Sequence, residues 1–434
     1  MPSSSGWSGA VLVALGSFTG AGSCLAQEPK PIAGDTGLLR EEADGIAFDA
    51  SARMRVEYPD RKLVDLPQRE ESLGLFRLLG SIDAQAGALA GFVQVGAHQS
   101  VRDRGNPVEN NGLDVQQAFV DFTPQRVGSE QLTRIRVGRS EMAYEFIALR
   151  DAPNVRRSWD GARVTLIRRG LTTNLFAVNA VQPKTGEFDD SSTDAPRLLG
   201  AHVRLAEGVA RIWGSAWFYS ARQEDVAFLA GTANADTRFA GIVLETKLGN
   251  VEASVGGGRQ GGRFGGMPIR AHYVEGEIGY RWSKQKTPAF AALRYSSFSG
   301  GRSDGDVLRT FNPLFPNYAY STEAALQSPS NLTKAGLLIE VELPAGLKLE
   351  YRGEGLWRYS ALDAFYTPVG TPFITPDGSA DRSLAIQQQF KATWEATPQL
   401  TLSGAVVHFA PDSFLRRAGL RAGYFGMVQL EAKF

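Results

Sequence analysis

The sequence predicts an all-β fold, a transmembrane antiparallel β-barrel of about 18 strands with short periplasmic turns and long extracellular loops. Three observations lead to this prediction. Apolar and polar residues alternate along most of the chain, as they do in strands with one face toward lipid. Short and long connections follow one another between these strands, and the final segment alternates up to a terminal aromatic residue.

Composition favours one large β unit rather than several soluble domains. The 434 residues include 48 glycines and 10% aromatic residues, without a seam rich in proline and serine that would separate domains. The net charge at pH 7 is zero, whereas a nucleic-acid-binding domain would carry a basic excess. We therefore expect no nucleic-acid partner.

The first residues resemble a secretory signal. The apolar run around 10–15 is far shorter than the ~20 residues of a spanning helix. Small residues at 24 and 26, three residues and one residue before the expected cut, fit a cleavage site, so we expect 1–26 to be a signal peptide. Residues 27–44 have no periodicity and are expected to form a periplasmic lead-in, followed by an outer-membrane β-barrel over 45–434.

The first strand illustrates the pattern that the others repeat. Phe48, Met54 and Tyr58 share one parity, and Arg53 and Arg55 share the other. Eighteen segments of this kind are predicted, at 48–58, 74–86, 89–100, 112–123, 131–139, 159–169, 171–181, 197–206, 209–221, 236–248, 250–258, 267–282, 287–298, 332–343, 346–359, 382–396, 399–410 and 420–434.

The connections between these segments differ in length. Tight turns are expected at 87–88, 169–170, 207–208, 249–250, 344–346 and 397–398. Long loops are expected at 59–73, 101–111, 140–158, 182–196, 222–235, 259–266, 299–331, 360–381 and 411–419. Short turns at one end and long loops at the other are typical of an outer-membrane barrel, so we expect the protein to be located in the bacterial outer membrane.

The final segment and the aromatic residues support the same location. Tyr424, Leu430 and Phe434 share the outward parity, and we expect Phe434 to be the signal that the barrel assembly machinery recognises. Trp357 and Trp394 also have outward parity, where aromatic girdles lie at the membrane interfaces.

The stretch 131–169 carries a local excess of positive charge. It contains nine arginines and four acidic residues, and both of its ends alternate like strands. We interpret it as a hairpin whose long loop folds partly into the pore. Charges avoid the lipid-facing side of a barrel, so the arginines should face the lumen. The candidate pore-lining residues are Arg136, Arg139, Arg156, Arg157, Arg163, Arg134, Arg53, Arg55, Arg77, Arg294 and Arg352. For any one of them, an ion pair that only braces the wall is an equally good interpretation.

Motifs of enzymes and metal sites are sparse. Residues 256–261 have the spacing of a phosphate-binding glycine loop, but no predicted helix follows them. The four histidines lie on different segments without ligand spacing, and no nucleophile elbow is present. We expect no catalytic residue, no metal and no cofactor.

Three blocks of sequence resemble a known family. They are VGRSE at 137–141, RDAPNVRRSWDGAR at 150–163 and FNPLFP at 311–316. In these blocks the chain is similar to the alginate export outer-membrane porins. This resemblance implies a monomeric eighteen-stranded barrel whose arginine-rich constriction guides an anionic polysaccharide. Arg139, Arg156, Arg157 and Arg163 fall within the matching motif.

The leading hypothesis is an outer-membrane diffusion pore, selective for anions, that conducts an anionic polysaccharide such as alginate. An uptake porin for small carboxylates or other organic acids is the alternative within the same class. A barrel enzyme or an adhesin would be of a different class.

Overall fold

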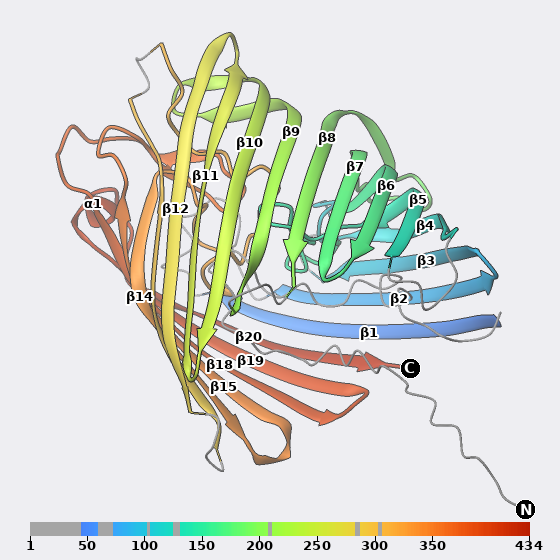
Figure 1. Cartoon of the computed structure of the whole chain (residues 1–434). Helices are drawn as coiled ribbons and strands as arrows, with labels where there is room; N and C mark the ends of the chain where they lie inside the picture. The colour runs from blue at the N-terminus through green and yellow to red at the C-terminus, as the bar shows by residue number, and fades with distance from the viewer. Residues whose placement is uncertain are drawn as a thin grey trace, which may run out of the picture.

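The computed structural model describes residues 45–59, 73–101, 105–124, 131–206, 211–282, 287–302 and 306–434. The predicted signal peptide and lead-in lie outside the described residues. Eighteen antiparallel strands form one sheet, and the first strand pairs with both the second and the last, which closes the barrel. Figure 1 shows this closure, with the blue β1 beside the red β20. The predicted fold class is confirmed.

The barrel strands have the following bounds: β1 (Gly45–Pro59), β2 (Leu73–Ala86), β3 (Leu89–Ser100), β4 (Asn111–Phe122), β5 (Gln131–Glu141), β6 (Ser158–Arg168), β7 (Leu171–Gln182), β8 (Ser191–Leu205), β9 (Ile212–Phe228), β10 (Gly231–Leu248), β11 (Val251–Phe264), β12 (Met267–Trp282), β13 (Ala289–Phe298), β14 (Leu332–Leu343), β15 (Leu347–Arg358), β18 (Ser383–Thr397), β19 (Leu400–Pro411) and β20 (Gly423–Lys433). The connections between them contain the strand pair β16 (Phe365–Tyr366) and β17 (Pro372–Ile374), the short helix α1 (Ser413–Arg417) and the 3-10 turn η4 (Pro344–Gly346).

Side-chain parity separates the two faces of the barrel as the alternation predicts. On β1, Phe48 and Tyr58 are 73% and 57% exposed, whereas Arg53 and Arg55 are 4% and 3% exposed. Apolar side chains therefore face outward toward lipid, and the charged ones face the lumen. No helix in the described part of the chain is long and apolar enough to cross a membrane.

Tight turns join the strands at one end of the barrel. Gly87 and Gly249, at two of the predicted turns, have φ angles of 59° and 64°, a conformation that glycine adopts without a steric penalty. The loops predicted at 222–235 and 259–266 are wrong, because β9, β10 and β11 continue through most of these residues. Beyond the membrane both faces of these strands carry polar residues, so the alternation stops there although the strands continue.

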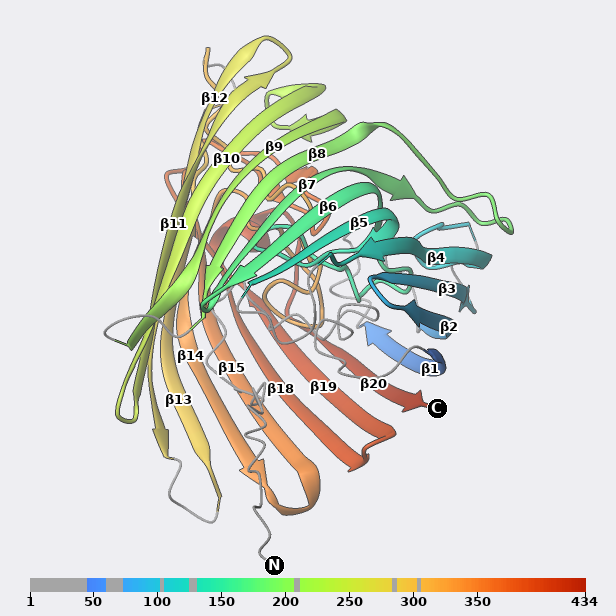
Figure 2. The same ribbon diagram turned by 45° about the vertical axis from the view of Figure 1, so that its right-hand side comes forward.

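Two connections fold into the barrel instead of remaining outside it. They are residues 142–157, between β5 and β6, and the described residues of 299–331, between β13 and β14. Figure 2 shows both running inside the ring of strands. The two loops also contact each other, because the Ala148 amide donates to the Phe315 carbonyl at 2.9 Å.

The apolar core lies inside the barrel and includes buried residues of β6 to β15 and of β18 to β20. Phe146 of the first inward loop is its centre, with ring-centroid distances of 4.9 Å to Phe239, 4.8 Å to Tyr273 and 5.2 Å to Phe311. Phe239 and Tyr273 come from β10 and β12, so the loop reaches the wall across from β1 and β2, which its other residues contact. This loop therefore connects the aromatic core with the charged residues of β1 and β2.

Candidate functional site

Three arginines converge on one carboxylate in the lumen. Asp151, on the loop between β5 and β6, lies with its Oδ1 2.8 Å from Arg77 Nη2, 2.8 Å from Arg156 Nε and 3.7 Å from Arg53 Nη1. The Asp151 side chain is 27% exposed, whereas those of Arg53 and Arg77 are each 2% exposed. The carboxylate is therefore the accessible member of the group, which we call the Asp151 site.

Asn154 fixes the loop that carries Asp151. Its Nδ2 donates to the carbonyl of Phe76 at 2.8 Å, and its Oδ1 accepts from Arg53 Nη2 at 2.9 Å. The Asn154 amide donates to Glu109 Oε2 at 2.9 Å. The Asn154 side chain is fully buried, so these hydrogen bonds are protected from water and hold the loop against β1 and β2.

Charged residues continue from the Asp151 site along the wall. Arg55 follows Arg53 on the same face of β1, and its Nη1 lies 3.0 Å from Glu323 Oε2. The other Glu323 oxygen lies 2.7 Å from Lys391 Nζ on β18. Farther along, on β15, Arg352 pairs with Glu350 at 2.8 Å.

These charges come from β15 and β18, from β1 and β2, which lie beyond β19 and β20 around the barrel, and from the two inward loops. We call them the charged belt, and its members are Arg77, Arg53, Arg156, Asp151, Arg55, Glu323, Lys391, Glu350 and Arg352. The belt brings together five of the predicted arginines, from β1, β2, β15 and the loop after β5.

Arg134 and Arg136 lie elsewhere, on β5. Arg136 binds both oxygens of Asp121 at 2.7 Å, and its guanidinium lies 3.6 Å above the centre of the Phe119 ring. Arg134 Nε lies 3.5 Å from the same carboxylate. Both arginines are buried, Arg136 almost completely. This arrangement matches the interpretation of wall-bracing ion pairs.

The other predicted arginines have separate partners. Arg139 binds Asp160 of β6 at 2.8 and 3.1 Å. Arg157 Nη1 donates to the carbonyls of Ala148 and Phe315 at 3.0 and 2.9 Å, so it joins the two inward loops. The last two lie on the wall, where Arg163 donates to the Tyr144 hydroxyl at 3.4 Å and Arg294 pairs with Glu277 at 2.9 Å.

The positive excess of the stretch 131–169 is offset from outside the stretch. Asp121 of β4 pairs with Arg134 and Arg136, and Asp114 of the same strand lies 3.9 Å from Arg139. Sequence reasoning missed Asp151 as a site residue, although it stands inside the motif RDAPNVRR between the arginines. It also missed Glu323 and Lys391, for which no local pattern gave a signal.

Part of the belt is accessible from the lumen. Asp151 is 27% exposed, Arg352 and Glu350 are each 20% exposed, and Lys391 is 28% exposed, whereas Arg53, Arg55 and Arg77 are buried. Exposed ion pairs contribute only about 0.2–1 kcal/mol each. An ion passing through a pore must bind weakly and at several points, so that it can both enter and leave, and the accessible members of the belt suit that requirement.

A closed antiparallel barrel with an apolar outer face and a charged belt inside defines a channel of the bacterial outer membrane. Residues 45–428 match the profile described as "Alginate export", and the chain belongs to this family. Both the family and the fold are of the channel type. No curated protein matches the chain in a sequence comparison.

Solved structures of similar fold are outer-membrane porins. The crystal structure of OccK11 (OpdR) from Pseudomonas aeruginosa has a TM-score of 0.59 and 13% identity, over 90% of this chain and 96% of that one. OccK2 (OpdF) of the same organism, in complex with glucuronate, has a TM-score of 0.55 and 11% identity, over 90% of this chain and 97% of that one. OpdK with vanillate, also from P. aeruginosa, has a TM-score of 0.56 and 11% identity, over 90% of this chain and 98% of that one. At these identities the likeness extends to the fold alone.

Proposed function

We propose that the protein is an anion-selective diffusion pore that conducts an anionic polysaccharide such as alginate, with the Asp151 site and the charged belt as its arginine-rich constriction. The observation that carries this proposal is the Asp151 site itself. Three arginines contact one carboxylate that the chain supplies, and that carboxylate is 27% exposed. A carboxylate of the substrate can take its place.

The chemistry of a polyuronate suits such a belt. Each sugar carries one carboxylate, so the polymer can exchange one arginine contact for the next as it moves. The planar guanidinium matches a carboxylate with two parallel hydrogen bonds, which a lysine cannot form. Because the chain's own acids offset the arginines, each contact stays weak enough for the polymer to leave.

Uptake of small organic acids is the second candidate function. It is favoured by the ligands named for two porins of similar fold, glucuronate and vanillate, which are both small carboxylates. The two candidates share the anion-selective site and differ in the size of the substrate.

Planar-bilayer recording tests the proposal. The purified protein should form channels whose reversal potential in a salt gradient indicates anion selectivity. Oligouronates added to one side should block the current at lower concentrations than glucuronate does. Preferential block by monomeric carboxylates would favour the uptake function, and a channel without selectivity would refute the proposal.

A matched pair of variants locates the constriction. Arg156→Gln removes a cation of the belt, whereas Arg416→Gln removes an arginine of α1 whose side chain is 68% exposed. The first should lower anion selectivity and weaken the block, and the second should change neither. Equal effects of the two substitutions would mean that the constriction lies elsewhere.

A further inference from the structure

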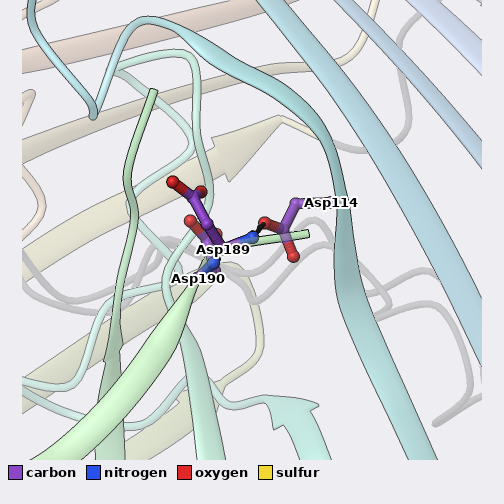
Figure 3. A group of neighbouring side chains, drawn as sticks. All are labelled: Asp114, Asp189 and Asp190. Atoms are coloured by element: carbon purple, nitrogen blue, oxygen red, sulfur yellow. Dashed lines mark hydrogen bonds between the residues drawn. The ribbon is translucent and has the colours of Figure 1, made fainter. Parts of the chain in front are cut away.

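Three carboxylates lie together at the rim of the barrel, apart from the charged belt. Asp114 comes from β4, and Asp189 and Asp190 come from the connection between β7 and β8 (Figure 3). One oxygen of each lies within 4.8 Å of the others. Two oxygens bound to the same Ca²⁺ ion at about 2.4 Å can be at most about 4.8 Å apart. The three side chains are therefore close enough to share one calcium ion.

Backbone hydrogen bonds hold this group in place. The amides of Asp189 and Asp190 donate to Asp114 Oδ2 at 2.9 and 3.0 Å. The Gly112 amide donates to the Gly186 carbonyl at 3.1 Å, and the Phe188 amide donates to the Leu113 carbonyl at 3.0 Å. The connection is thus attached along the first residues of β4, and the carboxylates cannot separate without breaking these bonds.

Two acceptor oxygens at this group have no donor. Asn111 is 2% exposed, and its amide group points at the carboxylates, because Nδ2 donates to Asp190 Oδ2 at 2.7 Å. Among the described residues no donor reaches Asn111 Oδ1 or the buried Asp189 Oδ1. Buried acceptors without a donor are rare and destabilising, and a bound cation would satisfy both.

Two cations lie near the three carboxylates, and neither makes a close ion pair with them among the described residues. Arg139 Nη1 is 3.9 Å from Asp114 Oδ1, but Arg139 makes its close contact with Asp160, at 2.8 Å. Lys184 Nζ donates to the main-chain oxygen of Asp189, at 2.7 Å, and not to its carboxylate.

We propose that the carboxylates of Asp114, Asp189 and Asp190, with the amide oxygen of Asn111, form a binding site for a calcium ion. All four ligands are hard oxygen donors, which Ca²⁺ prefers. The site goes beyond the proposed pore function, because it lies outside the belt.

The site faces the extracellular end of the barrel. The tight turn at 169–170 marks the periplasmic end, so the connection between β7 and β8 and the start of β4 lie at the opposite end. Extracellular calcium modules bind with dissociation constants of about 0.1–1 mM. The ion would fasten the connection to β4 on the outer surface, where calcium is available at that concentration.

Equilibrium dialysis with radioactive Ca²⁺ tests the proposal on the full chain folded in detergent and stripped with a chelator. The protein should bind one ion saturably with a dissociation constant of about 0.1–1 mM. Asp189→Asn should weaken this binding by about tenfold, because the affinity follows the charge of the ligands. Asp194→Asn is the matched control, since Asp194 is exposed on the same strand hairpin, and it should leave binding unchanged.

Gel mobility before and after boiling shows whether Asp189→Asn folds. If it does not fold, a second variant still tests the proposal. Asn111→Asp adds a fourth carboxylate, and it should tighten Ca²⁺ binding and make the unfolding temperature depend on Ca²⁺. The proposal is wrong if the wild type has no saturable site, or if Asp189→Asn and Asp194→Asn change binding equally. Stronger binding of Mg²⁺ than of Ca²⁺ would overturn the assignment to calcium.

Discussion

Replacing Asp151 with asparagine should make the channel more selective for anions. The substitution removes the negative charge that three arginines share, at 2.8, 2.8 and 3.7 Å, and keeps the size of the side chain. The loop should stay in place, because Arg53 also donates to the main-chain oxygen of Asp151 and Asn154 keeps its own anchors. The perturbation is therefore mainly electrostatic.

The expected magnitude follows from Coulomb's law. One unit charge about 8 Å from a passing ion contributes about 0.5 kcal/mol in water and about 2 kcal/mol at an effective dielectric constant of about 20. Screening over about 10 Å at 0.1 M salt reduces these values to roughly 0.2–0.9 kcal/mol. The substitution lowers the free energy of an anion in the pore by this amount and raises that of a cation by the same amount. The anion-to-cation permeability ratio should therefore rise about twofold to twentyfold.

Reversal potentials in a salt gradient measure this ratio directly. The shift should be largest at low salt and should nearly vanish at 1 M, where the screening length is only about 3 Å. Asp194→Asn makes the same charge change on an exposed residue and serves as the control. An equal shift in both variants, or a shift that persists at 1 M salt, would refute the assignment of Asp151 to the conducting path.

Three further changes have defined outcomes. Phe146→Ala should remove about 3–5 kcal/mol of packing free energy, so the folded gel band should be lost at a lower temperature. The same substitution should raise conductance. The lipid-facing Phe48→Ala should do neither. Arg157→Gln weakens the contact between the two inward loops, and single-channel currents should become noisier with little change in reversal potential; a large change would place Arg157 in the conducting path. Deleting Phe434 should reduce the amount of protein in the outer membrane, as measured by fractionation, and an unchanged amount would contradict its role as an assembly signal.

The strands were predictable because their signal is local. On β1 the parity of Phe48 and Arg53 decides which side chain faces lipid, and the structure agrees. The ends of β9, β10 and β11 were not predictable in the same way. Beyond the membrane both faces of a strand are wet, so alternation stops at about 221 although the hydrogen-bonded ladder continues to Phe228.

The site was predictable only in part, because its pairings are not local. The charge excess pointed to the hairpin of β5 and β6, and Arg156 of that hairpin pairs with Asp151 of the charged belt. Arg55 pairs with Glu57 of its own strand at 2.7 Å and also with Glu323 of the second inward loop at 3.0 Å, and the partner of Arg136 is Asp121, outside the charged stretch. The Glu323 contact depends on how a loop without periodicity folds inside the barrel, and the Asp121 contact depends on the register of β4 and β5. Sequence spacing determines neither.

The closure of the barrel sets a limit on the order of folding. β1 and β20 pair over nine residue positions, from Ser51 with Lys433 to Pro59 with Phe425, and the Phe434 amide donates to Ala50 at 2.8 Å. Nearly the whole described chain separates these two strands, so this pairing has the highest contact order in the molecule. Until β20 exists, β1 keeps one unpaired edge, which in a membrane leaves its hydrogen-bonding groups unsatisfied. The ring can therefore close only in the last step, and a nascent barrel needs a partner at the β1 edge until then.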